Sequence, residues 1–173
     1  VRSYPELLTS RRFWGYALTA AAATGAFFAF LGGGPFVATV ILGLTPERLG
    51  FYFGFIAAGY LLGNFVSARW SERFGISRMM IGGALSGAVA MAASCALFWF
   101  GATHPLALFG PIFFVGLGNG MTLPSANAGL LSARPHLAGS ASGLGGALMV
   151  GGGAGLSAFA GSLLSVETGA LPL

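Results

Sequence analysis

A short charge-rich stretch between two long uncharged ones is the feature that most limits how this chain can fold. Residues 68–78 form the densest cluster of charge, whereas 49–68 before it and 79–133 after it hold no Asp, Glu, Lys or Arg. A charge in hydrocarbon costs several kcal/mol, so such a cluster belongs at a membrane surface. The chain is 55% hydrophobic and 7% charged, far from the roughly 25% charged residues of a soluble domain. We therefore predict an all-α, polytopic membrane protein.

Five apolar stretches are long enough to cross a hydrocarbon core of about 30 Å as helices that rise about 1.5 Å per residue. The predicted spans are about 13–42, 49–68, 79–100, 106–132 and 137–164. We expect residues 1–12 to be the end of a cytoplasmic linker and residues 165–173 to be an external tail. The sequence opens on Val1 without the features of a signal peptide, so we expect it to be a piece of a longer protein.

The arginines fall on alternate sides of these spans. Three precede the first span, three lie in 69–78 and one is Arg134, whereas the other side holds only Arg48, next to Glu47. By the positive-inside rule, the arginine-rich side is cytoplasmic. We therefore predict a multi-pass protein of the cytoplasmic (inner) membrane with a cytoplasmic N-terminus. Because the arginines gather at span ends rather than on one face, the net charge does not indicate nucleic-acid binding.

Small residues four positions apart recur along the spans and let helices pack closely in lipid. The pairs are Gly50/Gly54, Gly59/Gly63, Gly83/Gly87, Gly116/Gly120, Gly139/Gly143 and Gly151/Gly155. They predict that the spans form one bundle. Packing or bending is also predicted at Gly34, Pro35 and Pro124, because proline removes a helix hydrogen bond. The run of glycines ending at Pro35 is expected to break or bend the first span.

Several kinds of active site are excluded by composition. The chain has no Asp and no Lys, which removes phosphate-loop lysines, Asp-based calcium loops and Schiff-base lysines. His104 and His136 fall in turns on opposite sides of the membrane, and no predicted span contains a histidine. We therefore expect no metal, no cofactor and no catalytic residue, and do not expect an enzyme.

The charged stretch resembles the G-x-x-x-[DE]-R-x-G-x-x-[RK] loop of major facilitator superfamily transporters. Glu72, Arg73, Gly75 and Arg78 stand at its matching positions, and Ala68 stands where the family usually has glycine. In that family the loop follows the second helix of each six-helix half on the cytoplasmic side, as it does in the predicted topology. The resemblance implies a conformational loop, and our hypothesis is that Glu72 and Arg73 latch helix ends during transport. The alternative is a solvated turn.

Two further stretches resemble one branch of that family, the Bcr/CflA drug-resistance exporters. They are residues 33–37 and residues 121–143. The resemblance covers nearly the whole chain and implies five transmembrane helices of a six-helix half-bundle, the second half of a transporter. It also implies proton-driven drug efflux. No ionisable group lies inside a predicted span, so the coupling acid for the proton is expected in the other half.

Aromatic and polar side chains near the middle of the spans are the candidates for substrate contact. They are Thr24, Phe27, Phe28, Tyr60, Asn119 and Asn127. Rings offer flat contact area and an amide offers one orienting hydrogen bond, which suits a small lipophilic substrate. The alternative for each is ordinary packing, since an intramembrane Asn often bonds a neighbouring helix and an aromatic ring often faces lipid or the core.

The predicted function is that of the C-terminal half of a secondary active transporter in a lipid bilayer, performing proton-coupled multidrug efflux by alternating access. Two alternatives stay open. One is a carrier of the same superfamily for a small metabolite, such as a sugar or an organic anion. The other is a non-transporting membrane scaffold that uses the same glycine-mediated packing.

Overall fold

The computed structural model describes residues 4–102 and 104–164, and these are almost entirely helical. The elements are α1 (Tyr4–Leu8), α2 (Arg11–Phe36) with a π-helical continuation (Val37–Ile41), α3 (Pro46–Phe74), α4 (Ile76–Trp99), α5 (Leu106–Ala133), a 3-10 turn (Pro135–Leu137) and α6 (Ala138–Leu163). Five of these helices are long and apolar enough to cross a membrane. The predicted all-α, five-helix fold class is confirmed.

Some helices reach beyond the predicted spans, and α3 does so at both of its ends. For example, α3 has 29 residues, and would be about 43 Å long at 1.5 Å per residue, so it exceeds the hydrocarbon core. Much of the charged stretch is therefore helical, and the connection between α3 and α4 is Gly75 alone. Its φ of 85° lies in the region that glycine adopts without steric cost.

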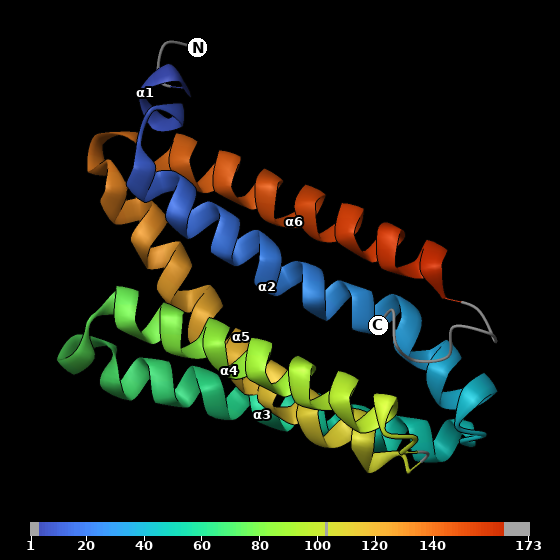
Figure 1. Ribbon diagram of the computed structural model, residues 1–173. Coiled ribbons are helices and arrows are strands. Elements are labelled where there is room, and N and C mark those ends of the chain that lie inside the picture. The colour runs from blue at the N-terminus through green and yellow to red at the C-terminus, as the bar shows by residue number, and fades with distance from the viewer. Residues whose placement is uncertain (1–3, 103, 165–173) are drawn as a thin grey trace.

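Helix α5 is the centre of the bundle. In its most apolar window 56% of the residues are buried, compared with 39% in α2 and 17% in α3 and in α4. Figure 1 shows α2 and α6 lying side by side, whereas α3 and α4 both lie against α5. The central helix is thus in contact with each of the other four spans.

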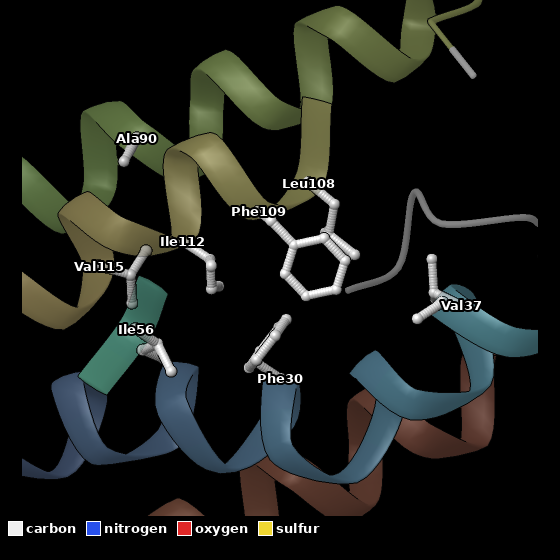
Figure 2. Close-up of a cluster of buried hydrophobic side chains, with 9 residues drawn as sticks. Phe30, Val37, Ile56, Ala90, Leu108, Phe109, Ile112 and Val115 are labelled. Atoms are coloured by element: carbon white, nitrogen blue, oxygen red, sulfur yellow. The ribbon is translucent and has the colours of Figure 1, made fainter. Parts of the chain in front are cut away.

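The largest hydrophobic core joins α5 to α2 and α3 near the end of the bundle where α5 begins. Phe30 of α2 packs edge-to-face on Phe109 of α5, with ring centroids 6.1 Å apart, and Tyr52 of α3 stacks on the same ring at 4.6 Å. Figure 2 shows the buried residues that surround these rings, including Ile112 and Val115 of α5. Aromatic pairs of this kind add about 0.5–1.5 kcal/mol beyond their buried area.

Glycines bring α5 into backbone contact with its neighbours, but only some of the predicted pairs do so. An added Cβ at Gly59 or Gly63 of α3 would overlap a carbonyl oxygen of α5, and Gly116 and Gly120 of α5 show the reverse relation to α3. Gly83 of α4 likewise lies against the Gly118 carbonyl of α5, but the remaining predicted positions differ. An added Cβ would meet no described atom within 4 Å at Gly50, Gly54, Gly87, Gly139, Gly143, Gly151 and Gly155.

The prolines inside helices do not end them. Helix α2 passes through Pro35 and continues as the π-helical segment, so the first span is not broken there. Helix α5 contains Pro111 and Pro124. Pro111 cannot bond to the carbonyl of Ala107, and the hydroxyl of Ser94 from α4 donates to that carbonyl at 3.0 Å. A neighbouring helix thus satisfies the acceptor that the proline leaves.

Candidate functional site

The six predicted substrate-contact residues lie in separate places. Asn119 is only 6% exposed and Tyr60 is 40% exposed, while Asn127 is also exposed. Phe27 packs against the hydrophobic core of Figure 2, and its ring lies 6.2 Å from that of Phe28. The structure therefore does not bring the six together in one pocket.

Thr24 and Phe28 lie in the seam between α2 and α6. An added Cβ at Gly153 would lie 3.1 Å from the methyl carbon of Thr24 and 3.1 Å from the ring of Phe28. In the same seam, Ser157 donates a hydrogen bond to the Phe28 carbonyl at 2.9 Å. The Thr24 hydroxyl is buried without a hydrogen-bond partner among the described residues. This seam is a tight helix contact in which Gly153, rather than the predicted Gly151 and Gly155, faces α2.

Asn119 lies in a groove between α2, α4 and α5, which we call the α2–α4–α5 groove. Its volume is about 430 Å³. The residues that line it are Leu18, Thr19, Ala22, Ala23 and Ala26 of α2, Gly83, Ala84, Gly87, Ala88 and Met91 of α4, and Val115 and Asn119 of α5. Only Asn119 and Thr19 bring polar side chains to it, and the Thr19 hydroxyl already donates to the Gly15 carbonyl at 2.7 Å.

A second, more polar hollow lies between α3 and α5, and the sequence analysis did not identify it. This α3–α5 notch has a volume of about 310 Å³. It is lined by Asn64, Ser67, Ala68, Ser71, Ile76, Pro124, Ser125 and Ala128. A signal for it exists in the sequence, since Asn64, Ser67 and Ser71 recur at i, i+3 and i+7, the spacing of one helix face.

Hydrogen bonds order the polar groups of the notch. The Ser67 and Ser125 hydroxyls are buried and lie 3.3 Å apart across the α3–α5 contact. The Asn64 amide nitrogen donates to the carbonyl of Tyr60, one turn earlier, at 2.9 Å. Because that bond uses one N–H of the amide, a second N–H and the amide oxygen retain bonding capacity. Of the predicted residues, Tyr60 precedes the notch on α3 and Asn127 follows Pro124 on α5.

The predicted conformational loop lies at an exposed end of the bundle. Glu72, Arg73, Gly75 and Arg78 are all exposed. The guanidinium of Arg73 lies 5.9 Å from the ring centroid of the adjacent Phe74. No ion pair joins Glu72 or Arg73 to another residue in the described part of the chain.

Glu6 makes both of the contacts between a carboxylate and a basic side chain in the described residues. Its carboxylate lies 3.4 Å from the guanidinium of Arg134 and 3.2 Å from Nε2 of His136. These contacts connect α1 with the segment between α5 and α6, and the fully buried Leu7 packs beneath them. Two predicted cytoplasmic segments, the N-terminal stretch and the α5–α6 connection, thus meet at one end of the bundle.

Comparison with known proteins decides the family. A model described as "Major Facilitator Superfamily" matches residues 1–158. The chain belongs to the major facilitator superfamily (MFS). It is 33% identical, over 146 residues, to the uncharacterized MFS-type transporter YdgK of Bacillus subtilis (strain 168). No solved structure matches the chain significantly.

The MFS chain is shorter than this relative. The matched region covers 83% of the chain but 36% of YdgK, so the chain spans about a third of that transporter's length. The fold is that of a multi-pass membrane protein of a transporter family. In the part of the chain that the structure describes, no three His, Cys, Asp or Glu residues are grouped as metal ligands would be.

Proposed function

We propose that this chain forms part of an MFS exporter of the Bcr/CflA type that moves small lipophilic molecules out of the cell in exchange for protons. The observation that carries the proposal is the α3–α5 notch. It brings together the amide of Asn64 and the hydroxyls of three serines, and no charged residue lines it. A few neutral polar groups within apolar surroundings orient an amphipathic molecule without requiring it to be charged.

The same notch favours a second candidate function. Three serine hydroxyls and an amide are also groups that bond to the hydroxyls of a sugar-like metabolite. A carrier of such a metabolite is therefore the alternative. An organic anion is less suited, because no Arg, Lys or His lines the notch.

Membrane orientation is part of the proposal. We place the arginine-rich ends of the helices, with the N-terminus of the chain, on the cytoplasmic side of the inner membrane.

The loop residues Glu72 and Arg73 would latch helix ends when the other half of the transporter approaches. Their exposure and lack of a described ion-pair partner leave both side chains available for such a contact. If the Glu72→Ala variant is expressed normally and transports at the wild-type rate, Glu72 does not have this role.

The test of function uses the complete gene, expressed in cells that lack their own exporters. Inverted membrane vesicles carry a proton gradient, and its collapse is recorded as lipophilic drugs, sugars and organic anions are added. Dose-dependent collapse by several unrelated drugs supports drug/proton exchange. Collapse by a sugar alone supports the metabolite carrier. No response in vesicles shown to contain the protein would contradict both and favour the scaffold.

Two asparagine variants then locate the substrate. Asn64→Ala removes the amide of the α3–α5 notch, whereas Asn119→Ala removes the amide of the α2–α4–α5 groove. We expect Asn64→Ala to raise the substrate concentration for half-maximal transport about fivefold or more, as loss of one orienting hydrogen bond does. A larger effect of Asn119→Ala would instead place the substrate in the groove.

A further inference from the structure

Tyr16 connects three helices at the end of the bundle where α4 begins. Its ring lies against Gly129 of α5, where an added Cβ would overlap the ring. Its hydroxyl lies 2.9 Å from the hydroxyl of Ser77 in α4. The half-buried ring also packs against two separate hydrophobic clusters, one around Phe13 and one around Ala20. The side chain therefore fills the junction of α2, α4 and α5.

The hydrogen bond to Ser77 acts on the connection between α3 and α4. Ser77 is the second residue of α4 and lies two positions after Gly75, the single residue of that connection. Helices α2 and α4 otherwise contact one another little. The first turn of α4 is closed by a bond from the Met79 amide to the Gly75 carbonyl at 3.2 Å. The Tyr16–Ser77 hydrogen bond is thus the polar contact that joins this turn to α2 in the described part of the chain.

We propose that Tyr16 is a positioning residue for transport, which pins the α3–α4 turn to α2 and α5. The inference rests on the proposed function, because it concerns how the charged turn moves during alternating access. With the pin in place, the turn and its residues Glu72 and Arg73 move together with α2 when one half of the transporter rocks against the other. Without the Tyr16–Ser77 hydrogen bond, the turn moves independently of α2. Glu72 and Arg73 then reach their contacts with the other half of the transporter less often.

The experiment compares full-length wild-type protein with Tyr16→Phe, Ser77→Ala and the double variant in lipid nanodiscs. Tyr16→Phe retains the ring against Gly129 and removes only the hydroxyl. Hydrogen exchange is measured for the amides of residues 79–82, whose carbonyl partners lie in the Gly75–Arg78 region. We expect each single variant to speed exchange about fivefold, the effect of one net hydrogen bond. The double variant should be no faster than either single variant, because both remove the same bond.

Two matched variants distinguish loss of the Tyr16–Ser77 hydrogen bond from a general destabilisation of the bundle. Ser77→Thr keeps a hydroxyl, so its amides 79–82 should exchange as slowly as those of the wild type. Tyr52→Phe removes a hydroxyl near the other end of the bundle and should leave the exchange of these amides unchanged. Unchanged exchange in Tyr16→Phe, or additive effects in the double variant, would overturn the pin whether or not the protein transports any drug. Transport is measured on the same variants. Faster exchange with an unaltered transport rate would overturn the positioning role, whereas a wild-type protein without transport would count against the proposed function alone.

Discussion

Substituting alanine for Gly83 and, separately, for Gly87 tests whether close backbone approach stabilises the contact of α4 with α5. The two glycines lie one turn apart on α4, and the gain in helix propensity favours each variant by up to about 1 kcal/mol. Their surroundings differ. An added Cβ at Gly83 would lie 2.5 Å from both the Gly118 carbonyl oxygen and the Thr122 hydroxyl, whereas one at Gly87 would meet no described atom within 4 Å.

The cost at Gly83 has two parts. Because ordinary contact begins near 3.4 Å, the helices must separate by about 1 Å to clear the Gly118 carbonyl, and overpacking of this kind costs about 1–3 kcal/mol. Thr122 must also turn away. Turning Thr122 also breaks its hydrogen bond to the Met80 carbonyl, now 3.2 Å long, with a net cost of about 0.5–1.5 kcal/mol. After the gain in propensity, we expect Gly83→Ala to lose about 0.5–4.5 kcal/mol and Gly87→Ala to gain up to about 1 kcal/mol.

The assay is denaturant unfolding in one detergent at fixed micelle concentration, with helicity followed by circular dichroism. The midpoint for Gly83→Ala should fall below that of the wild type, and the midpoint for Gly87→Ala should equal or exceed it. If Gly83→Ala unfolds at the same denaturant concentration as Gly87→Ala, the α4–α5 backbone contact is not a source of stability and the reasoning from close approach is wrong.

Two other substitutions test particular contacts. Ser94→Ala leaves the Ala107 carbonyl, freed by Pro111, without its donor, so we expect a loss of about 1–3 kcal/mol, measured by the same unfolding assay. Leu7→Ala removes a fully buried side chain of α1 and should lower the free energy of α1 docking by about 2–5 kcal/mol. Limited proteolysis of residues 4–10 should then be faster, whereas Leu8→Ala, at a side chain that is 46% exposed, should have little effect.

The sequence is sufficient to predict the class and order of the spans, because charge excludes a residue from hydrocarbon wherever its partners lie. It is not sufficient to predict which glycines pack. Gly83 and Gly87 satisfy the same four-residue spacing, yet only Gly83 faces α5. Spacing fixes which residues share a helix face, whereas the direction of that face depends on tertiary contacts. Likewise, within the predicted glycine-rich stretch 151–155, Gly153 contacts α2, whereas the pair Gly151 and Gly155, which has the four-residue spacing, does not.

The candidate site was predictable only in part, for a geometric reason. Asn119 and Asn127 are two i, i+4 steps apart on α5, and each such step drifts about 40° around a helix with 3.6 residues per turn. The resulting offset of about 80° matters little on a surface helix, but α5 is packed on several sides. Asn119 consequently lies in the α2–α4–α5 groove, while Asn127 is exposed near the α3–α5 notch. The polar face of α3 could not by itself predict the notch, because residues of α5 form the other wall.

The polar contacts between the described spans are made by neutral groups, and this has a consequence for coupling. Hydroxyls donate to carbonyls or pair with one another, so they satisfy polar atoms inside the bundle without the cost of a charge. The contacts are Ser67–Ser125, Thr122–Met80, Ser86–Phe114, Ser94–Ala107, Ser157–Phe28 and Tyr16–Ser77. Serine and threonine hydroxyls are not ionisable coupling groups. If the proposed proton exchange is correct, we expect the acid that binds the proton to lie in the other half of the transporter, because no Asp, Glu, His, Lys or Arg lies inside a predicted span. That acid then acts on this half through substrate or through helix contacts. Neutralising that acid in the complete protein should therefore abolish drug-induced collapse of the proton gradient while drug binding at the α3–α5 notch persists.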